Sequence, residues 1–212
     1  MTEQNYEALR RAMVASQLRT TSVNDARVIA AMSAVPRERF VGADRAQLAY
    51  RDTGVPIGDG RAMPAPMVLG RLLTEARIAP RDTMLIVGAG TGYAAAVAAA
   101  LAGRVVALEE DASIAAGPLP ASIERVSGPL AEGWPDGAPY DVILFDGAVA
   151  EVPDAIIAQL AEGGRLAAPL IVDGVVRLAV GRKAGGAFGM TSFADAAAPV
   201  LPGFAKPLTF SF

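Results

Sequence analysis

The apolar residues of this chain fall into short runs, separated by helix-forming or turn-forming segments. Each short run predicts a buried strand, and these runs lie at residues 83–87, 104–108, 123–126, 140–145 and 165–170. Helices are predicted between them, at 67–76, directly after Gly92, and at 152–160. Pro153 suits the start of the last helix, and Gly163–Gly164 is predicted to close it. Strands that alternate with helices indicate an α/β fold with a mostly parallel sheet.

The N-terminal third does not follow this alternation. Residues 5–19 are predicted to be helical, and Asn24 or Asp25 can cap a second helix that Pro36 ends. A third short helix fits residues 43–50. Residues 51–66 are dense in glycine and proline, which predicts a long loop, and a long loop in a compact domain often carries function.

The C-terminal part predicts an antiparallel addition to the sheet. Residues 175–181 and 188–193 are typical of a hairpin around Gly185–Gly186. The tail at 199–212 is apolar and contains several prolines, and we expect it to pack on the sheet. With 212 residues, the chain is long enough to form one domain with a full core.

The most informative stretch is a predicted strand that ends in a glycine-rich turn. Gly88, Gly90 and Gly92 follow the run 83–87, and the next predicted strand is followed directly by Glu109. Glycine allows a sharp turn and a close approach of ligand to backbone, and a following helix aims free N–H groups at the turn. An acid at the end of the second strand suits the two hydroxyls of a ribose. This order predicts a nucleotide-cofactor site, and the spacing G-x-G-x-G favours S-adenosylmethionine.

Two other interpretations of this stretch remain open. Residues 84–103 carry no charge over a length that a membrane span requires, although four glycines and a threonine interrupt the run. An NAD site is the second alternative, although its usual fingerprint is G-x-G-x-x-G.

Composition narrows the chemistry. Lys and Arg number 19 against 22 Asp and Glu, and no basic block indicates binding to nucleic acid or to an anionic membrane. The chain has no cysteine and no histidine, which excludes disulfides, thiol nucleophiles, the usual zinc sites and a histidine general base. A carboxylate-only Mg²⁺ or Ca²⁺ site stays open, but no D-x-D-x-D spacing indicates one. The polar N-terminus lacks the apolar segment of a signal peptide, so a cytoplasmic protein is expected.

Several motifs, in the same order along residues 8–182, are similar to those of the protein-L-isoaspartate O-methyltransferases. They are VPRERFV at 35–41, VPIG at 55–58, VGAGTGY at 87–93, APYDVIL at 138–144 and QLAEGGRLAAPL at 159–170. Their combination is specific, and the chain is identified as a divergent member. The resemblance implies a Rossmann-like class I methyltransferase fold with a C-terminal antiparallel hairpin and an N-terminal helical extension. It also implies S-adenosyl-L-methionine as cofactor.

The resemblance further implies a substrate. The family methylates the free α-carboxylate of L-isoaspartyl residues in damaged proteins, so isoaspartyl-containing proteins or peptides are the expected partners. That carboxylate is already ionised at neutral pH, and the sulfonium donor makes the transfer an in-line displacement that needs no general base. A chain without histidine could therefore perform the reaction. Another carboxylate acceptor remains an alternative.

From the motifs we predict two sets of contacts in one domain covering 1–212. The core at 67–212 is expected to contact the cofactor through Gly88, Ala89, Gly90, Thr91, Gly92, Tyr93, Glu109, Glu110, Leu130 and Asp146. The N-terminal helices and loop at 1–66 are expected to face the substrate through Ile57, Gly58, Arg61, Met63, Pro64 and Pro66.

Three departures from the family pattern lie at positions that matter. Pro64 takes the place of the serine usually assigned to catalysis, and proline offers no hydrogen-bond donor. Ile86 replaces an acid before the glycine turn. Gly128-Pro129-Leu130 replaces a G-D-G segment near the adenine, which leaves the backbone N–H of Leu130 to reach that ring. No residue is therefore assigned a catalytic role.

Two charged residues have open roles. Asp146 is predicted either to bind the ammonium of the cofactor or a cationic substrate group, or to cap the following segment. Arg61 is predicted either to pair with a substrate carboxylate or to be a solvated loop charge. Three functions therefore remain: an isoaspartyl methyltransferase, a methyltransferase with another carboxylate or small-molecule acceptor, and an inactive cofactor-binding or interaction protein.

Overall fold

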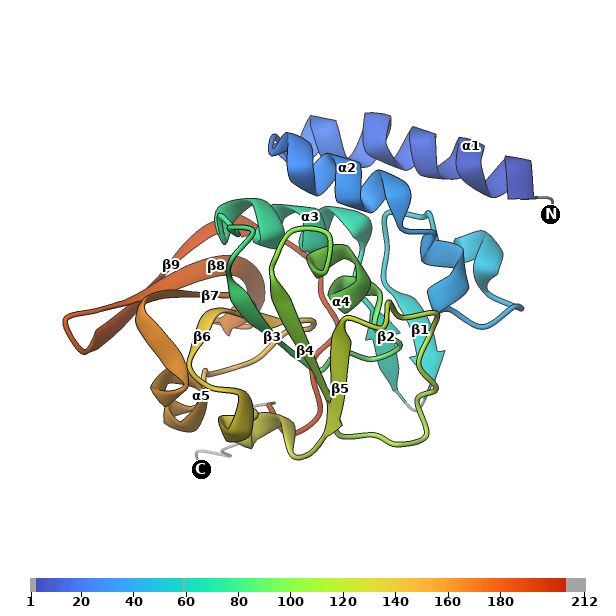
Figure 1. Cartoon of the computed structure of the whole chain (residues 1–212). Coiled ribbons are helices and arrows are strands. Elements are labelled where there is room, and N and C mark those ends of the chain that lie inside the picture. Colours follow the sequence, from blue (N-terminus) through green and yellow to red (C-terminus); the bar gives the residue numbers. More distant parts are fainter. Residues whose placement is uncertain (1–2, 59, 205–212) are drawn as a thin grey trace, which may run out of the picture.

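A single seven-stranded sheet forms the centre of the molecule. The computed structural model describes residues 3–58 and 60–204, and Figure 1 shows the arrangement. The strand order in the sheet is β5-β4-β3-β6-β7-β8-β9. The bounds of these strands are β3 Thr83–Val87, β4 Arg104–Glu109, β5 Ile123–Ser127, β6 Tyr140–Phe145, β7 Leu160–Val172, β8 Val175–Ala184 and β9 Ala187–Asp195.

The sheet is parallel from β5 to β7 and antiparallel from there to β9. Val87 at the end of β3 is paired with Leu108 in β4 and with Phe145 in β6. The chain therefore moves from β3 outward through β4 to β5, and then resumes on the other side of β3 with β6. This reversal is a topological switch point, the place where open α/β sheets bind ligands. The predicted parallel sheet with a C-terminal antiparallel hairpin is confirmed.

Both faces of the central strands are covered, which explains their continuous apolar sequences. In β3, Met84 and Ile86 lie in one core cluster, and Leu85 and Val87 lie in the other. Helices α2, α3 and α4 pack on the first face (Figure 1). The second face is covered by α5, by the segment around residues 130–134 and by the C-terminal segment.

The helices are mostly short. Their bounds are α1 Glu3–Met13, α2 Ala26–Ala34, α3 Pro66–Glu75, α4 Tyr93–Ala98 and α5 Asp154–Ala158. A π-helical turn, Val14–Leu18, and a 3₁₀ turn, Arg19–Thr21, continue α1, so the predicted helix is present but distorted at its end. Asp25 caps α2 as predicted, because its carboxylate accepts hydrogen bonds from the backbone N–H groups of Arg27 and Val28.

Three predictions for elements were wrong. The segment 43–50 contains only the 3₁₀ turn Ala46–Leu48. Residues 51–66 are not a plain loop, since β1 Val55–Gly58 and β2 Arg61–Met63 pair antiparallel within them. Gly163–Gly164 does not close a helix but lies inside β7, which is more than twice as long as predicted. The pairing of β6 with β7 is irregular at this point, and Gly163 supplies the left-handed conformation (φ +77°) that the irregularity requires.

The C-terminal segment joins the second face of the sheet. The backbone of Val200 forms a bridge with Ala148, and Phe204 stacks edge-on against Phe145 with 5.6 Å between ring centres. The predicted packing of the tail is therefore confirmed for residues 199–204, and the rest of the tail lies outside the described residues.

Candidate cofactor and acceptor site

The predicted site residues meet where β3, β4 and β6 end. The backbone N–H groups of Gly88 and Ala89 donate to the Leu108 carbonyl at 3.1 and 2.9 Å. On the other side, the N–H of Asp146 donates to the Val87 carbonyl at 3.0 Å. The glycine turn, Glu109 and Asp146 therefore lie at one edge of the sheet, as their positions in the sequence predicted.

The glycine turn has the geometry that only glycine adopts easily. Gly88, Gly90 and Gly92 all have positive φ, at 73°, 55° and 96°. A Cβ at Gly90 would approach Cδ1 of Ile57 to 2.7 Å, and one at Gly88 would approach Leu201 to 2.7 Å. The turn is therefore covered by flexible apolar side chains from β1 and from the C-terminal segment.

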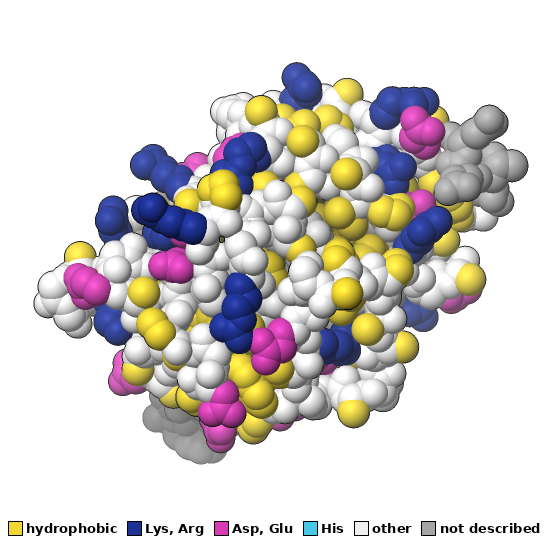
Figure 2. Space-filling model, in the orientation of Figure 1, with side chains coloured by type: hydrophobic (Ala, Val, Ile, Leu, Met, Phe, Trp, Pro, Cys, Tyr) yellow, Lys and Arg dark blue, Asp and Glu magenta, His cyan; other side chains and the backbone are white. Residues whose placement is uncertain are grey.

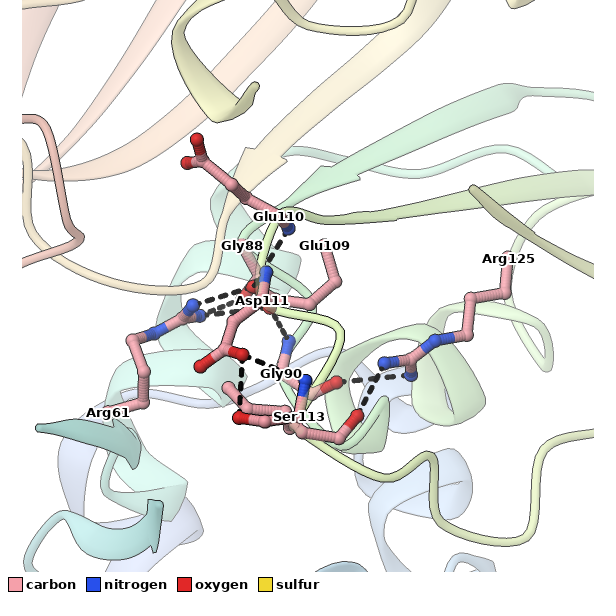
Figure 3. A network of polar contacts seen from close by, with 9 residues as sticks. Arg61, Gly88, Gly90, Glu109, Glu110, Asp111, Ser113 and Arg125 are labelled. Carbon is pink, nitrogen blue, oxygen red and sulfur yellow. Dashed lines mark hydrogen bonds and ion pairs between the residues drawn. The ribbon is translucent and has the colours of Figure 1, made fainter. Parts of the chain in front are cut away.

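Glu109 is the centre of a buried polar network (Figure 3). It is 2% exposed, and its Oε1 accepts hydrogen bonds from the backbone N–H groups of Glu110 at 3.0 Å and Asp111 at 3.1 Å. Its Oε2 accepts from the N–H of Gly90 at 2.6 Å. The acid thus ties the glycine turn to the end of β4.

Arg61 completes this network from the opposite side. Its Nη1 lies 2.7 Å from Oε1 of Glu109, and its Nη2 lies 3.1 Å from Oε2, so the pair is bidentate. Nη2 also donates to the Gly88 carbonyl at 3.0 Å. Arg61 is 5% exposed. The prediction of a solvated loop charge is therefore wrong, because β2 points this side chain into the site instead of into solvent.

A cavity of about 340 Å³ opens beside Glu109, between the ends of β4 and β5. Its walls include Ile114, Ala115, Val126 and Ser127. Arg125 stabilises one wall by donating to the carbonyls of Gly90 at 3.1 Å and Ile114 at 2.9 Å (Figure 3). The volume lies in the range of small-ligand pockets, and a mostly apolar wall suits a heteroaromatic ring.

The charged side chains around this cavity are held in defined positions. Asp111 accepts hydrogen bonds from the backbone N–H and the hydroxyl of Ser113, at 2.8 and 2.6 Å, and these bonds lower the pKa of its carboxyl.

Two of the residues predicted to contact the cofactor differ in burial. Glu110 is exposed. Leu130 is buried and begins a 3₁₀ turn after Pro129, within the second core cluster.

Beneath the substrate-side loop lies a second buried cation, Arg37. It is fully buried, donates from Nε to the Ala49 carbonyl at 2.6 Å, and also donates from Nη2 to the Pro64 carbonyl. Its guanidinium lies 4.7 Å from the ring centre of Tyr93. Arg37 Nη1 and the Tyr93 hydroxyl have no hydrogen-bond partner among the described residues. Burial lowers the pKa of Arg37 and raises that of Tyr93.

Asp146 is a buried acid directly after β6. Its carboxyl is 9% exposed, and burial raises its pKa to about 7, although Arg37 and Arg61 oppose that shift. The acid is therefore poised to change charge near neutral pH, with two cations nearby. Its predicted contact with a ligand stays a prediction.

The six substrate-side residues lie on β1, on β2 and at the start of α3. Ile57 and Gly58 belong to β1, Arg61 and Met63 to β2, Pro64 follows β2, and Pro66 begins α3. Pro64 is buried, and its carbonyl is held by Arg37, so the position of the expected serine contributes no side-chain donor.

Two residues of the site, Arg37 and Leu201, were not predicted from the sequence. Arg37 lies in the VPRERFV motif. A single sequence does not distinguish this buried arginine from the exposed Arg39 in the same motif. Leu201 covers Gly88 from a segment that is more than 100 residues away in the sequence. The sequence of an apolar tail does not show which part of the fold its hydrophobic residues contact.

The described residues contain neither a cluster suited to a metal ion nor a helix suited to a membrane. In that part of the chain, no group of three or more acidic, histidine or cysteine side chains could hold a metal ion. None of its helices has both the length and the apolar character that crossing a bilayer demands. On the face shown in Figure 2, acidic and basic side chains are intermingled.

Comparison with known proteins gives one consistent family. The family model described as protein-L-isoaspartate(D-aspartate) O-methyltransferase matches residues 9–196. A Koribacter versatilis protein-L-isoaspartate O-methyltransferase is 41% identical over 190 residues, which is 86% of each chain. A Marinobacter nauticus protein of the same name is 35% identical over 203 residues, or 91% of this chain and 92% of that relative.

Solved structures share the fold. A structure named protein-L-isoaspartate O-methyltransferase superposes with a TM-score of 0.78 and 22% identity, over 92% of this chain and 66% of that one. A Plasmodium falciparum structure described under the same enzyme name, in complex with S-adenosyl-L-homocysteine, superposes with a TM-score of 0.75 and 18% identity, over 92% of this chain and 97% of that one.

Proposed function

The chain belongs to the protein-L-isoaspartate(D-aspartate) O-methyltransferase family, and from this premise we propose that it methylates the α-carboxylate of L-isoaspartyl residues with S-adenosylmethionine as donor. The observation that carries the proposal is the meeting of the glycine turn, Glu109 and Asp146 at the switch point of the sheet. The cofactor supplies an activated methyl group on a sulfonium.

The geometry suits this cofactor. Glu109 is a fixed carboxylate at the end of β4, the position at which an acid suits a ribose diol. The cavity of about 340 Å³ beside it would receive the adenine, with Ile114 and Val126 against the ring. The glycine turn would receive the amino-acid end of the cofactor, and Asp146 would face its ammonium.

The chain's own residues have little acid–base work to do in this reaction. The acceptor carboxylate is ionised at neutral pH, so no residue needs to remove a proton. Positioning of the carboxylate oxygen against the methyl carbon supplies most of the catalysis. The buried cations Arg37 and Arg61 favour an anionic acceptor on this side of the sheet.

Methyl transfer to a peptide tests the proposal. A peptide with one L-isoaspartyl residue should accept tritiated methyl groups, and the same peptide with a normal aspartyl residue should not. Glu109→Gln should reduce the transfer strongly. Glu124→Gln, at the opposite end of the neighbouring strand and exposed, should leave it unchanged. Absence of transfer to the isoaspartyl peptide would contradict the proposal.

A second candidate is methylation of another acceptor by the same cofactor. Two observations favour it: Pro64 offers no donor to an acceptor carboxylate, and Asp146 adds an acid with a pKa of about 7 to the site. An acceptor with a proton to lose, such as an amine or hydroxyl, would find a base in Asp146. A panel of acceptors, followed by release of S-adenosylhomocysteine, distinguishes the two. Binding of S-adenosylhomocysteine without transfer to any acceptor would favour an inactive cofactor-binding protein.

A further inference from the structure

Glu109 has no free capacity for a ribose while Arg61 is bound to it. The two carboxylate oxygens accept three backbone N–H bonds and two guanidinium bonds, all between 2.6 and 3.1 Å. A carboxylate offers about four lone-pair positions in total. A ribose diol can reach Glu109 only after the guanidinium has left it.

Arg61 is built so that it can leave. It lies on β2, a strand of three residues in a two-stranded sheet that is separate from the main sheet. The three backbone N–H groups that bind Glu109 come from the glycine turn and from the end of β4, and they are part of the main fold. The pair therefore joins a fixed partner to one carried by a small hairpin.

The guanidinium has an obvious second partner on its own side. Arg61 belongs to the segment that faces the acceptor, and guanidinium binds any carboxylate in the same bidentate geometry that it adopts here with Glu109. We infer that Arg61 exchanges partners: it binds Glu109 in the ligand-free protein and the carboxylate of the methyl acceptor once the cofactor ribose has taken Glu109. This inference rests on the proposed function.

The exchange makes the two ligands cooperative. The cofactor frees Arg61 for the acceptor, and the acceptor holds Arg61 away from Glu109. Each ligand must therefore tighten the binding of the other by the same factor, as linkage requires. If the pair is closed about nine-tenths of the time, that factor is roughly tenfold.

Calorimetric titration of the whole protein with S-adenosylhomocysteine tests this without catalysis. An isoaspartyl peptide at saturating concentration should tighten binding of S-adenosylhomocysteine to the wild-type protein by roughly tenfold. In Arg61→Gln, S-adenosylhomocysteine alone should bind roughly tenfold more tightly than to wild type, and the effect of the peptide should disappear.

The matched control is Arg104→Gln. Arg104 is at the start of β4, the strand that ends in Glu109, and forms an exposed ion pair with Glu124 at 2.6 Å. The Arg104→Gln variant loses the same positive charge and also an ion pair with a glutamate. Its affinity for S-adenosylhomocysteine, with and without the peptide, should equal that of wild type. Any loss of fold in Arg61→Gln would show in its melting temperature, and the wild-type cooperativity needs no variant.

The outcomes distinguish a failure of the partner exchange from a failure of the proposed function. If no variant binds S-adenosylhomocysteine, the proposed function and the exchange both fail. If wild type binds it and methylates the isoaspartyl peptide, but the peptide does not alter the affinity for S-adenosylhomocysteine, the exchange alone is wrong. Equal or weaker binding by Arg61→Gln, beside an unchanged Arg104→Gln, would also overturn it.

Discussion

Arg37 shows how much one buried side chain can hold together. It joins the carbonyls of Ala49 and Pro64, which belong to different segments, and places a cation on the face of Tyr93. A buried carbonyl that loses its donor costs about 1–3 kcal/mol. Arg37 is therefore the residue whose loss should most affect the substrate-side loop.

We expect Arg37→Met to lower the free energy of unfolding by about 3 kcal/mol, because two buried carbonyls lose their donors while the volume is nearly kept. Urea denaturation followed by circular dichroism measures the change. Arg51→Met, at an exposed position, is the control and should stay within about 0.5 kcal/mol of wild type. A small effect of Arg37→Met would show that the loop finds other donors.

The raised pKa of Asp146 predicts that the free energy of unfolding depends on pH. Its pKa is about 7 in the folded protein, against an ordinary value of 3.8, mainly because burial penalises its charge. As pH rises from about 4 to 7, the unfolded chain releases this proton while the folded chain keeps it, so stability falls by at most about 1.4 kcal/mol per pH unit. Above about pH 8 the contribution is constant.

Asp146→Asn removes this term. Wild type should therefore lose stability relative to Asp146→Asn as pH rises from 4 to 7, and the difference should level off above about pH 8. Paired urea titrations at several pH values measure it, and the other carboxyl groups cancel in the difference. A difference that does not vary with pH would show that the carboxyl is hydrated in the folded state.

At the scale of elements, α2 depends on the capping residue directly before it, Asp25. The carboxylate of Asp25 accepts from the N–H groups of Arg27 at 2.7 Å and Val28 at 3.4 Å. Asp25→Ala should cost about 1 kcal/mol of stability by thermal or urea unfolding, and Asp25→Asn should recover most of it. Equal losses in both variants would point to the charge of Asp25 rather than to its hydrogen bonds.

The sequence predicted the core strands well because burial on two faces leaves a plain signal. β3, β4 and β6 contain the uninterrupted apolar runs 84–87, 105–108 and 142–145, and each run is bounded by a turn or by a charged residue. The β1–β2 hairpin was missed because Pro56, Gly58 and Gly60 hide two very short strands among turn-forming residues. Its pairing rests on contacts that no local pattern shows.

Only the parts of the site that follow from the order of strands along the chain were predicted. The glycine turn and Glu109 were predicted because they lie at the ends of adjacent parallel strands. The partner of Glu109 was not, since Arg61 is 48 residues away and many arginines could have filled that place. A single sequence does not show which cation faces which acid across the fold.

At the scale of the whole molecule, the C-terminal segment is part of the folding unit. Phe204 is 6% exposed and packs on Phe145, and Leu201 covers the glycine turn. The second core cluster therefore contains residues from both halves of the chain. This arrangement predicts a single cooperative domain.

Phe204→Ala should lower the free energy of unfolding by about 3 kcal/mol, because it removes a buried aromatic ring and leaves a cavity. The single tryptophan, Trp134, packs against the same cluster and reports it by fluorescence, while circular dichroism reports the whole sheet. Both signals should shift together. Val200→Ala, at a position 42% exposed, should change little, and two separate transitions would contradict the single domain.

The ion pair of Arg61 with Glu109 also bears on how a newly made chain reaches its folded form. A carboxylate as deeply buried as Glu109 opposes folding unless a cation accompanies it. Arg61 is carried by the same chain, so the buried charge of Glu109 is paired without any ligand. A newly made chain therefore does not have to wait for the cofactor before it buries Glu109.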